Sequence, residues 1–280
     1  FPMSINAADV MKLRDRTGMQ MMKCKDALTR AGGDMEKAIE LLRSENKAVT
    51  VKLGERETGE GRIGVSIEGG NGGIIELRCE SAPVAKNEHF VKLATDLARH
   101  VAHKEPKTAD EMLAQPLAGD EKKTVGDRIA ELVGLMRENV KIKRMAKLTG
   151  TLASYIHHDG SVGVLIAVEG TPKDAQVLKD VCMHAAATPS MAALREQVPQ
   201  ERVDKEMAFV RGQVEEQAKN KPADIITKIA EGKMRTWYES IVLNEQKFVK
   251  DETKTVGQVL EANGVKLKGF VRFKVGEVLA

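Results

Sequence analysis

A β-hairpin pattern followed by a helical pattern occurs twice in this 280-residue chain, and this repetition most strongly constrains its fold. In the first copy, apolar residues alternate with polar or small ones over 63–67 and 75–79, on either side of a glycine-rich loop. In the second copy, predicted strands over 152–158 and 162–169 flank Asp159-Gly160, which favours a tight hairpin turn. Hairpins with helices between them predict an α+β fold and not a wound parallel sheet.

The helices that follow the two hairpins resemble each other. They are expected over 87–104 and 174–187, and the segment 96–102 aligns with 180–186. We interpret this agreement as an internal duplication of a hairpin-plus-helix unit. Two shorter helices are expected after the first unit, near 109–115 and 125–138.

Three short helical patterns precede the first unit. Gly32-Gly33 ends the second of them, and Asp34 can cap the third. Such a compact pattern resembles ubiquitin-associated domains, which bind other proteins. The expected parts of the chain are a three-helix docking module of this kind (1–44), a linker (45–62), core subdomain N (63–140), core subdomain C (141–199), a coiled-coil hairpin arm (200–240), and a C-terminal module that returns a strand to the core (241–280).

The arm is expected from the spacing of apolar residues after Pro199. These residues step by four, three and four positions, as in a coiled-coil seam: Val203, Met207, Val210 and Val214. The chain is expected to turn at Asn220-Lys221-Pro222, and the charged outer faces predict that the arm projects from the body. A short helix over 255–263 and a strand from Val265 to Val275 follow.

Composition argues against several classes of function. Lys and Arg total 44 against 41 Asp and Glu, and aromatic residues make up 3%, so direct nucleic-acid binding is not expected. No apolar run has the length of a membrane span, and no signal-peptide pattern begins the sequence, so we expect a cytoplasmic protein. Three dispersed cysteines favour neither disulfides nor zinc. Gly59-x-Gly61-x-x-Gly64 lacks the strand and helix that a dinucleotide site needs.

The histidines are the remaining candidates for chemistry. His100 and His184 each follow an aspartate by four residues, which predicts Asp–His pairs that stabilise helices or lie at a subdomain seam. His184, beside three alanines, is also consistent with a buried, hydrogen-bonded core residue. No catalytic constellation is evident, so we expect a binding protein without cofactor or metal and not an enzyme.

The segment 13–28, which reads LRDRTGMQMMKCKDAL, closely resembles the N-terminal signature of the bacterial elongation factor Ts family. Further stretches with the same resemblance follow in order, and together they cover essentially the whole chain: 33–38, 84–87 with Phe90, 183–187, 254–258 and 269–277. The resemblance implies a guanine-nucleotide exchange factor that promotes GDP release from elongation factor Tu. It also implies a docking face at Arg14, Met21 and Met22, against the GTPase domain of that partner.

One segment departs from the family pattern. After the first hairpin the family usually reads Thr-Asp-Phe-Val-Ala-Lys, and its Phe is linked to magnesium dislocation as a wedge in the partner. Here the expected contact residues are Ser81, Ala82, Pro83 and Val84, so the acidic and aromatic residues are missing. Phe90 matches a different family position. There are two alternatives to an exchange factor: a ribosome- or RNA-associated protein, and a ubiquitin-associated adaptor without exchange activity. The oligomeric state is left open.

Overall fold

The computed structural model describes residues 5–217 and 222–277. The N-terminal module consists of α1 (Ala7–Thr17), α2 (Met21–Arg30) and the first part of α3 (Met35–Leu53). The Asn6 side chain caps α1, and the Asp34 carboxylate accepts from two amides at the start of α3. Between the helices lies a small apolar core of its own, formed by Val10, Leu13, Met19, Cys24, Ala27, Leu28, Ala38 and Leu42.

Helix α3 is longer than the sequence predicts. The module is expected to end at residue 44, but the helix continues to Leu53, nine residues into the expected linker. Asn46 is buried against α7, and Leu53 belongs to the core cluster of the next part of the molecule. The helix is therefore shared between the module and the core. Only the segment from Gly54 to Gly59 joins them as non-helical chain.

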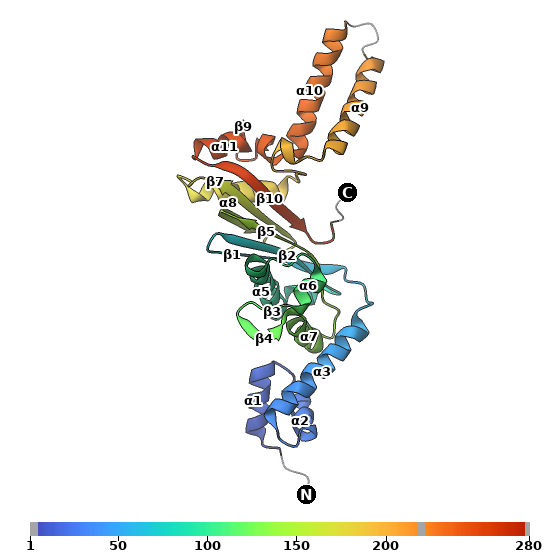
Figure 1. The fold of residues 1–280 in the computed structure, drawn as a ribbon, viewed down its shortest axis with the longest axis vertical. Helices are drawn as coiled ribbons and strands as arrows, with labels where there is room; N and C mark the ends of the chain where they lie inside the picture. The colour runs from blue at the N-terminus through green and yellow to red at the C-terminus, as the bar shows by residue number, and fades with distance from the viewer. Residues whose placement is uncertain (1–4, 218–221, 278–280) are drawn as a thin grey trace.

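Two three-stranded antiparallel sheets form the centre of the molecule (Figure 1). The first has the order β1 (Glu60–Glu68), β2 (Asn71–Cys79), β5 (Lys141–Thr149), and the second has the order β10 (Lys266–Lys274), β7 (Val162–Glu169), β6 (Thr151–Ile156). The sheets face each other across Ile63, Ile74, Leu165 and Phe273. The predicted α+β fold, with both hairpins, is confirmed.

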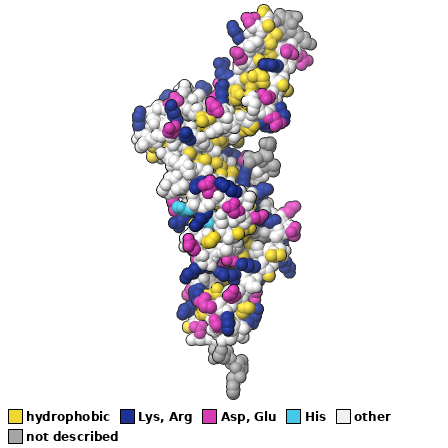
Figure 2. All heavy atoms as spheres, viewed as in Figure 1, with side chains coloured by type: hydrophobic (Ala, Val, Ile, Leu, Met, Phe, Trp, Pro, Cys, Tyr) yellow, Lys and Arg dark blue, Asp and Glu magenta, His cyan; other side chains and the backbone are white. Residues whose placement is uncertain are grey.

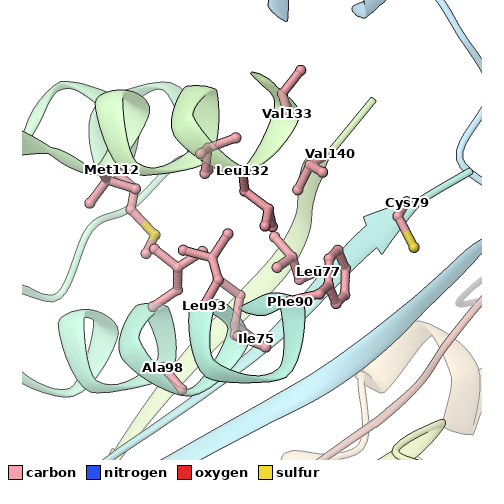
Figure 3. Close-up of a cluster of buried hydrophobic side chains, with 14 of the residues drawn as sticks. Ile75, Leu77, Cys79, Phe90, Leu93, Ala98, Met112, Leu132, Val133 and Val140 are labelled. Carbon is pink, nitrogen blue, oxygen red and sulfur yellow. The ribbon is translucent and has the colours of Figure 1, made fainter. Parts of the chain in front are cut away.

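Each sheet has a long helix on its outer face, α5 (Glu88–Lys104) on the first and α8 (Ala175–Ala187) on the second. Alternate residues of β2 divide between the two faces, so that Ile74 lies between the sheets while Ile75 and Leu77 pack under α5 (Figure 3). Gly73 allows the close approach of α5, since a Cβ there would lie 2.0 Å from the Ala98 carbonyl oxygen.

The duplication extends beyond the hairpin and helix. We call the first sheet with α5 the first half of the core, and the second sheet with α8 the second half. In the first half a small hairpin, β3 (Pro116–Leu117) and β4 (Asp120–Thr124), leads into α7 (Val125–Met136). In the second half, β8 (Lys247–Phe248) and β9 (Asp251–Thr255) lead into α11 (Val256–Ala262). Capping boxes begin both helices, with Thr124 and Asp127 in one and Thr255 and Gln258 in the other.

Shorter elements complete the body: α4 (Ala82–Lys86), α6 (Ala109–Ala114) and 3₁₀ turns at Arg195–Gln197 and Leu243–Glu245. The arm is formed by α9 (Gln200–Gln217) and α10 (Ala223–Ile241), which project from the second half (Figure 1). Val210 and Val214 are buried against α10, and Val203 and Met207 are partly buried there. Of the predicted turn, Asn220 and Lys221 lie outside the described residues.

Candidate partner-binding site

The first candidate surface is on α1 and α2 of the N-terminal module. Arg14 is exposed on α1, and Met21 and Met22 begin α2 with 43% and 73% of their surfaces exposed. Met11, which the sequence argument did not single out, is also exposed on α1. Methionine is flexible and polarizable, so exposed methionines on adjacent helices can adapt to an apolar partner surface.

The second candidate surface is the segment 81–84, which lies at the end of β2. These expected contact residues form the start of a short helix, α4 (Ala82–Lys86), with Ser81 at the N-cap and Ala82 and Pro83 in the first turn. Proline is compatible with the first turn of a helix, where no intrahelical partner is needed for its nitrogen. Pro83 is exposed and Ala82 partly exposed, whereas Val84 is buried in the core cluster under α5. The surface offered here is therefore that of Ala82 and Pro83.

Glu138, which the sequence argument missed, holds the start of this segment. The Ser81 backbone N–H donates to Glu138 Oε2 at 3.0 Å, and the Ser81 hydroxyl donates to Glu138 Oε1. Burial, with the Glu138 carboxylate as the second cause, raises the pKa of the adjacent Cys79 thiol to about 12. No sequence signal links residues 57 positions apart, so only the folded chain reveals this contact.

Asn139 joins the same region to the end of α3. Its backbone N–H donates to Glu80 Oε1 at 2.7 Å, and its side-chain amide donates to the carbonyl oxygens of Gly54 and Arg56. The Asn139 side chain is buried, and both N–H groups of its amide are satisfied by these bonds. Three chain segments thus meet where the second candidate surface begins: residues 54–56, 79–81 and 138–139.

The N-terminal module also contacts the core directly. Lys23 Nζ lies 3.4 Å from the Gly134 carbonyl oxygen near the end of α7, and burial followed by repulsion from Arg137 lowers the pKa of Lys23. Gly134 is required for this packing, since a Cβ there would lie 2.0 Å from Asn46 Oδ1. The two candidate surfaces are therefore carried on parts that are packed together.

A cavity of about 420 Å³ lies between the module and the first half of the core. It is lined by residues from Arg16 to Met19 and by charged side chains of α5, the β3–β4 hairpin and α7. The charges are mostly paired, as in Lys92 with Asp96 and Lys123 with Glu131. On the face shown in Figure 2, basic and acidic side chains are intermingled over the lower body, which differs from the basic stripe typical of a nucleic-acid site.

The buried histidines are not paired as the sequence argument predicts. Asp96 pairs with Lys92 and Asp180 with Lys250, while His100 and His184 contact glutamines. The predicted Asp–His pairs are therefore wrong, because the aspartates face solvent-side lysines and the rings face the core. The expectation that His184 is a buried, hydrogen-bonded core residue is confirmed.

The structure contains few groups suited to covalent or metal chemistry. Cys24, Cys79 and Cys182 are buried, and burial raises the pKa of Cys182 to about 12. Within residues 5–217 and 222–277, no three His, Cys, Asp or Glu side chains gather to hold a metal ion. In the same described ranges, no helix is both long and apolar enough to cross a membrane.

Comparison with known proteins gives a consistent result. The family model described as elongation factor TS matches residues 83–277. A protein called elongation factor Ts from Thioalkalivibrio sulfidiphilus is 39% identical over 98% of this chain and 93% of its own length. Proteins of the same name from Methylococcus capsulatus and Halothermothrix orenii are 39% and 35% identical, with the same coverage.

Proposed function

Because the chain belongs to the elongation factor Ts family and is a translation elongation factor, we propose that it promotes GDP release from elongation factor Tu. The observation that carries the proposal is the exposure of residues that the family resemblance assigns to the partner. Arg14, Met21, Met22 and Pro83 all lie at the surface. The protein then acts by binding, without covalent chemistry, in the cytoplasm where translation takes place.

The physical basis of exchange by binding is linkage. A protein that binds the nucleotide-free GTPase more tightly than the GDP-bound one weakens GDP binding by the same factor. GDP in turn weakens the protein–protein complex, so that the exchange factor is released when nucleotide rebinds. The candidate surface has two separate contacts, one on the module and one on α4. Both can form at once only if the partner's elements have one particular arrangement, and this supports a preference for the nucleotide-free state.

Ala82 and Pro83 change the second contact relative to the family pattern. Burying a Phe side chain contributes about 1.5–3 kcal/mol, so a missing wedge corresponds to roughly tenfold to a hundredfold in that one contact. Pro83 gives a small and stiff surface instead, because its ring fixes its own φ. We propose that exchange relies more on the module's docking face and on the backbone of α4 than on an inserted aromatic ring.

Release of labelled GDP from elongation factor Tu of the same organism tests this proposal. Catalytic amounts of the protein are expected to accelerate release, and excess GDP is expected to dissociate the complex. A complex of equal affinity with and without nucleotide would contradict the proposal, since equal affinity for two states shifts no equilibrium. Salt-sensitive retention on RNA, without an effect on GDP release, would support the RNA-associated alternative instead.

A further inference from the structure

A single carboxylate fixes the point at which α4 begins. Glu138 accepts both the backbone N–H and the hydroxyl of Ser81, the residue immediately before Ala82 and Pro83. We infer that Glu138 is a positioning residue of the exchange site, which sets the direction in which Ala82 and Pro83 face the partner. This inference rests on the proposed function, and it adds a residue that does not itself form the candidate contact surface.

Helix α4 needs an external support because of its length. It has five residues, and a helix this short is not stable through its own hydrogen bonds. The Ser81 hydroxyl, which could cap α4, donates to Glu138 instead. The inner side of α4 is held by Val84 and Ala85 in the core, so that the Ser81–Glu138 contact fixes the remaining, outward-facing end.

Glu138 is held in turn by the residues on either side of it. Arg137 ends α7 in the left-handed region, with φ of 62°, and its N–H bonds to the Val133 carbonyl oxygen. A non-glycine residue with positive φ is uncommon and persists where its surroundings enforce it. Asn139, on the other side, is tied to Glu80 and to Gly54 and Arg56. The carboxylate therefore projects from a turn that is fixed at both ends.

This arrangement also connects the two candidate surfaces. The carbonyls that Asn139 binds lie directly after α3, the helix that carries the N-terminal module. Glu138 binds Ser81 from the same turn. The turn at 138–139 therefore holds both the end of α3 and the start of α4. A partner that contacts both surfaces is presented with one geometry, and small errors in such positioning can reduce a rate substantially.

The test compares Glu138→Gln, Ser81→Ala and the double variant with Glu245→Gln as a matched control. Glu245 is also a partly buried glutamate that accepts two hydrogen bonds, from Arg195 in the second half of the molecule. The measurements are the maximal GDP-release rate at saturating protein, the affinity for nucleotide-free elongation factor Tu, and the melting temperature.

We expect Glu138→Gln to lower the maximal rate about tenfold, because the substitution removes the negative charge and one of the two oxygens that accept from Ser81. Ser81→Ala should lower it less, and the double variant should be no slower than Glu138→Gln alone. Ser81→Thr, which keeps the hydroxyl, should retain the parent rate. Affinity, melting temperature and the Glu245→Gln rate should change little. A parent-like rate for Glu138→Gln, or a slower rate accompanied by an equal loss of stability, would overturn the inference.

Failure of the proposed function gives a different result. If the unaltered protein does not accelerate GDP release, the exchange proposal fails, and the positioning inference is then decided by amide hydrogen exchange in α4. The Ala85 N–H, which bonds to the Ser81 carbonyl oxygen at 3.1 Å, is the reporter. Exchange about tenfold faster in Glu138→Gln supports positioning by Glu138, and unchanged exchange refutes it.

Discussion

His100 and His184 occupy the same place in the two halves of the core. In each case Nδ1 accepts a backbone N–H at 3.2 Å, from Ala118 and Val249 respectively. Nε2 contacts a glutamine oxygen, of Gln115 at 2.7 Å in one half and of Gln246 at 3.0 Å in the other. Since Nδ1 is the acceptor, the proton is on Nε2 and both rings are neutral.

These neutral rings predict a loss of stability in mild acid. Burial lowers the pKa of both histidines below the ordinary value of 6.5. Below pH 6.5 the unfolded chain binds protons that the folded chain does not, so stability is fully present above that pH and falls as pH decreases toward the folded pKa. The loss reaches at most about 1.4 kcal/mol per pH unit for each histidine.

Urea unfolding between pH 7.5 and 5 measures this loss. A His100→Gln and His184→Gln double variant should have a smaller pH dependence than the parent, whatever its absolute stability. His89→Gln, at an exposed position of α5, serves as the control and should leave the pH dependence unchanged. An equal slope for parent and double variant would exclude these two residues as the cause.

Met22→Ala is expected to weaken partner binding without destabilising the fold. Met22 is 73% exposed, so its truncation should change the free energy of unfolding by less than about 0.5 kcal/mol. Loss of an apolar anchor at an interface costs about 1–2 kcal/mol, or roughly fivefold to thirtyfold in affinity. Arg14→Ala should behave in the same way. Titration calorimetry and thermal melting separate the two effects.

Met19→Ala is the matched control for the docking face. Met19 is 2% exposed within the same module, and its truncation should destabilise that module by about 2–5 kcal/mol. If Met22→Ala lowered the melting temperature as much as Met19→Ala, the surface position of Met22 would be wrong. If it changed neither property, Met22 would not belong to the interface.

Deletion of residues 1–44 should leave a folded core with reduced partner affinity. The remaining part of α3 still supplies Asn46, Val49 and Leu53 to the contacts with α7 and the core. Deletion of residues 1–53 removes these contacts as well, and should lower stability further by about 1.5–3 kcal/mol for Leu53 alone. Cooperative melting of both fragments is the measurement, and equal stability would show that α3 contributes nothing to the core.

Ala82→Asp with Pro83→Phe is expected to change the GDP-release rate more than complex affinity. Pro83 is exposed in the first turn of α4, where a Phe ring can reach the partner and an Asp is favoured by the helix dipole. A partner with a groove for an aromatic ring should release GDP about tenfold faster, whereas one fitted to a small surface should be slowed. If the double variant and the parent gave equal GDP-release rates at several magnesium concentrations, this segment would be excluded from the contact.

Strand β5 is one of the strands that the sequence analysis does not predict, and it shows why a local pattern can fail. A register shift in the pairing of β5 with β2 occurs between Glu76 and Leu77, so strict alternation along β5 is lost. Ile142 and Met145 pack toward the α5 side, while Ala146 and Leu148 lie between the sheets. The segment is also rich in basic residues, and one of them, Arg144, is drawn inward by the buried Glu76 at 2.6 Å. A pattern of period two cannot show such a strand.

The elements whose signals are local can be predicted from the amino-acid sequence. Alternation over 63–67 and 75–79 is enough to predict the first hairpin, and capping residues such as Asp34 mark helix starts. The segment 13–28 carries the resemblance to the family that whole-chain relatives show. These features depend on residues within a few positions of one another, where backbone geometry fixes which side chains share a face.

How those elements form a candidate site depends on long-range packing, which the folded structure reveals. That packing places Val84 in the core and Pro83 at the surface, extends α3 into the core, and brings Glu138 to Ser81. Contacts between residues so distant in the chain depend on the packing of whole sheets and helices, which bury apolar surface and satisfy polar groups together. No local pattern shows which distant residues will meet, because the sequence around each of them is the same whether or not the contact forms.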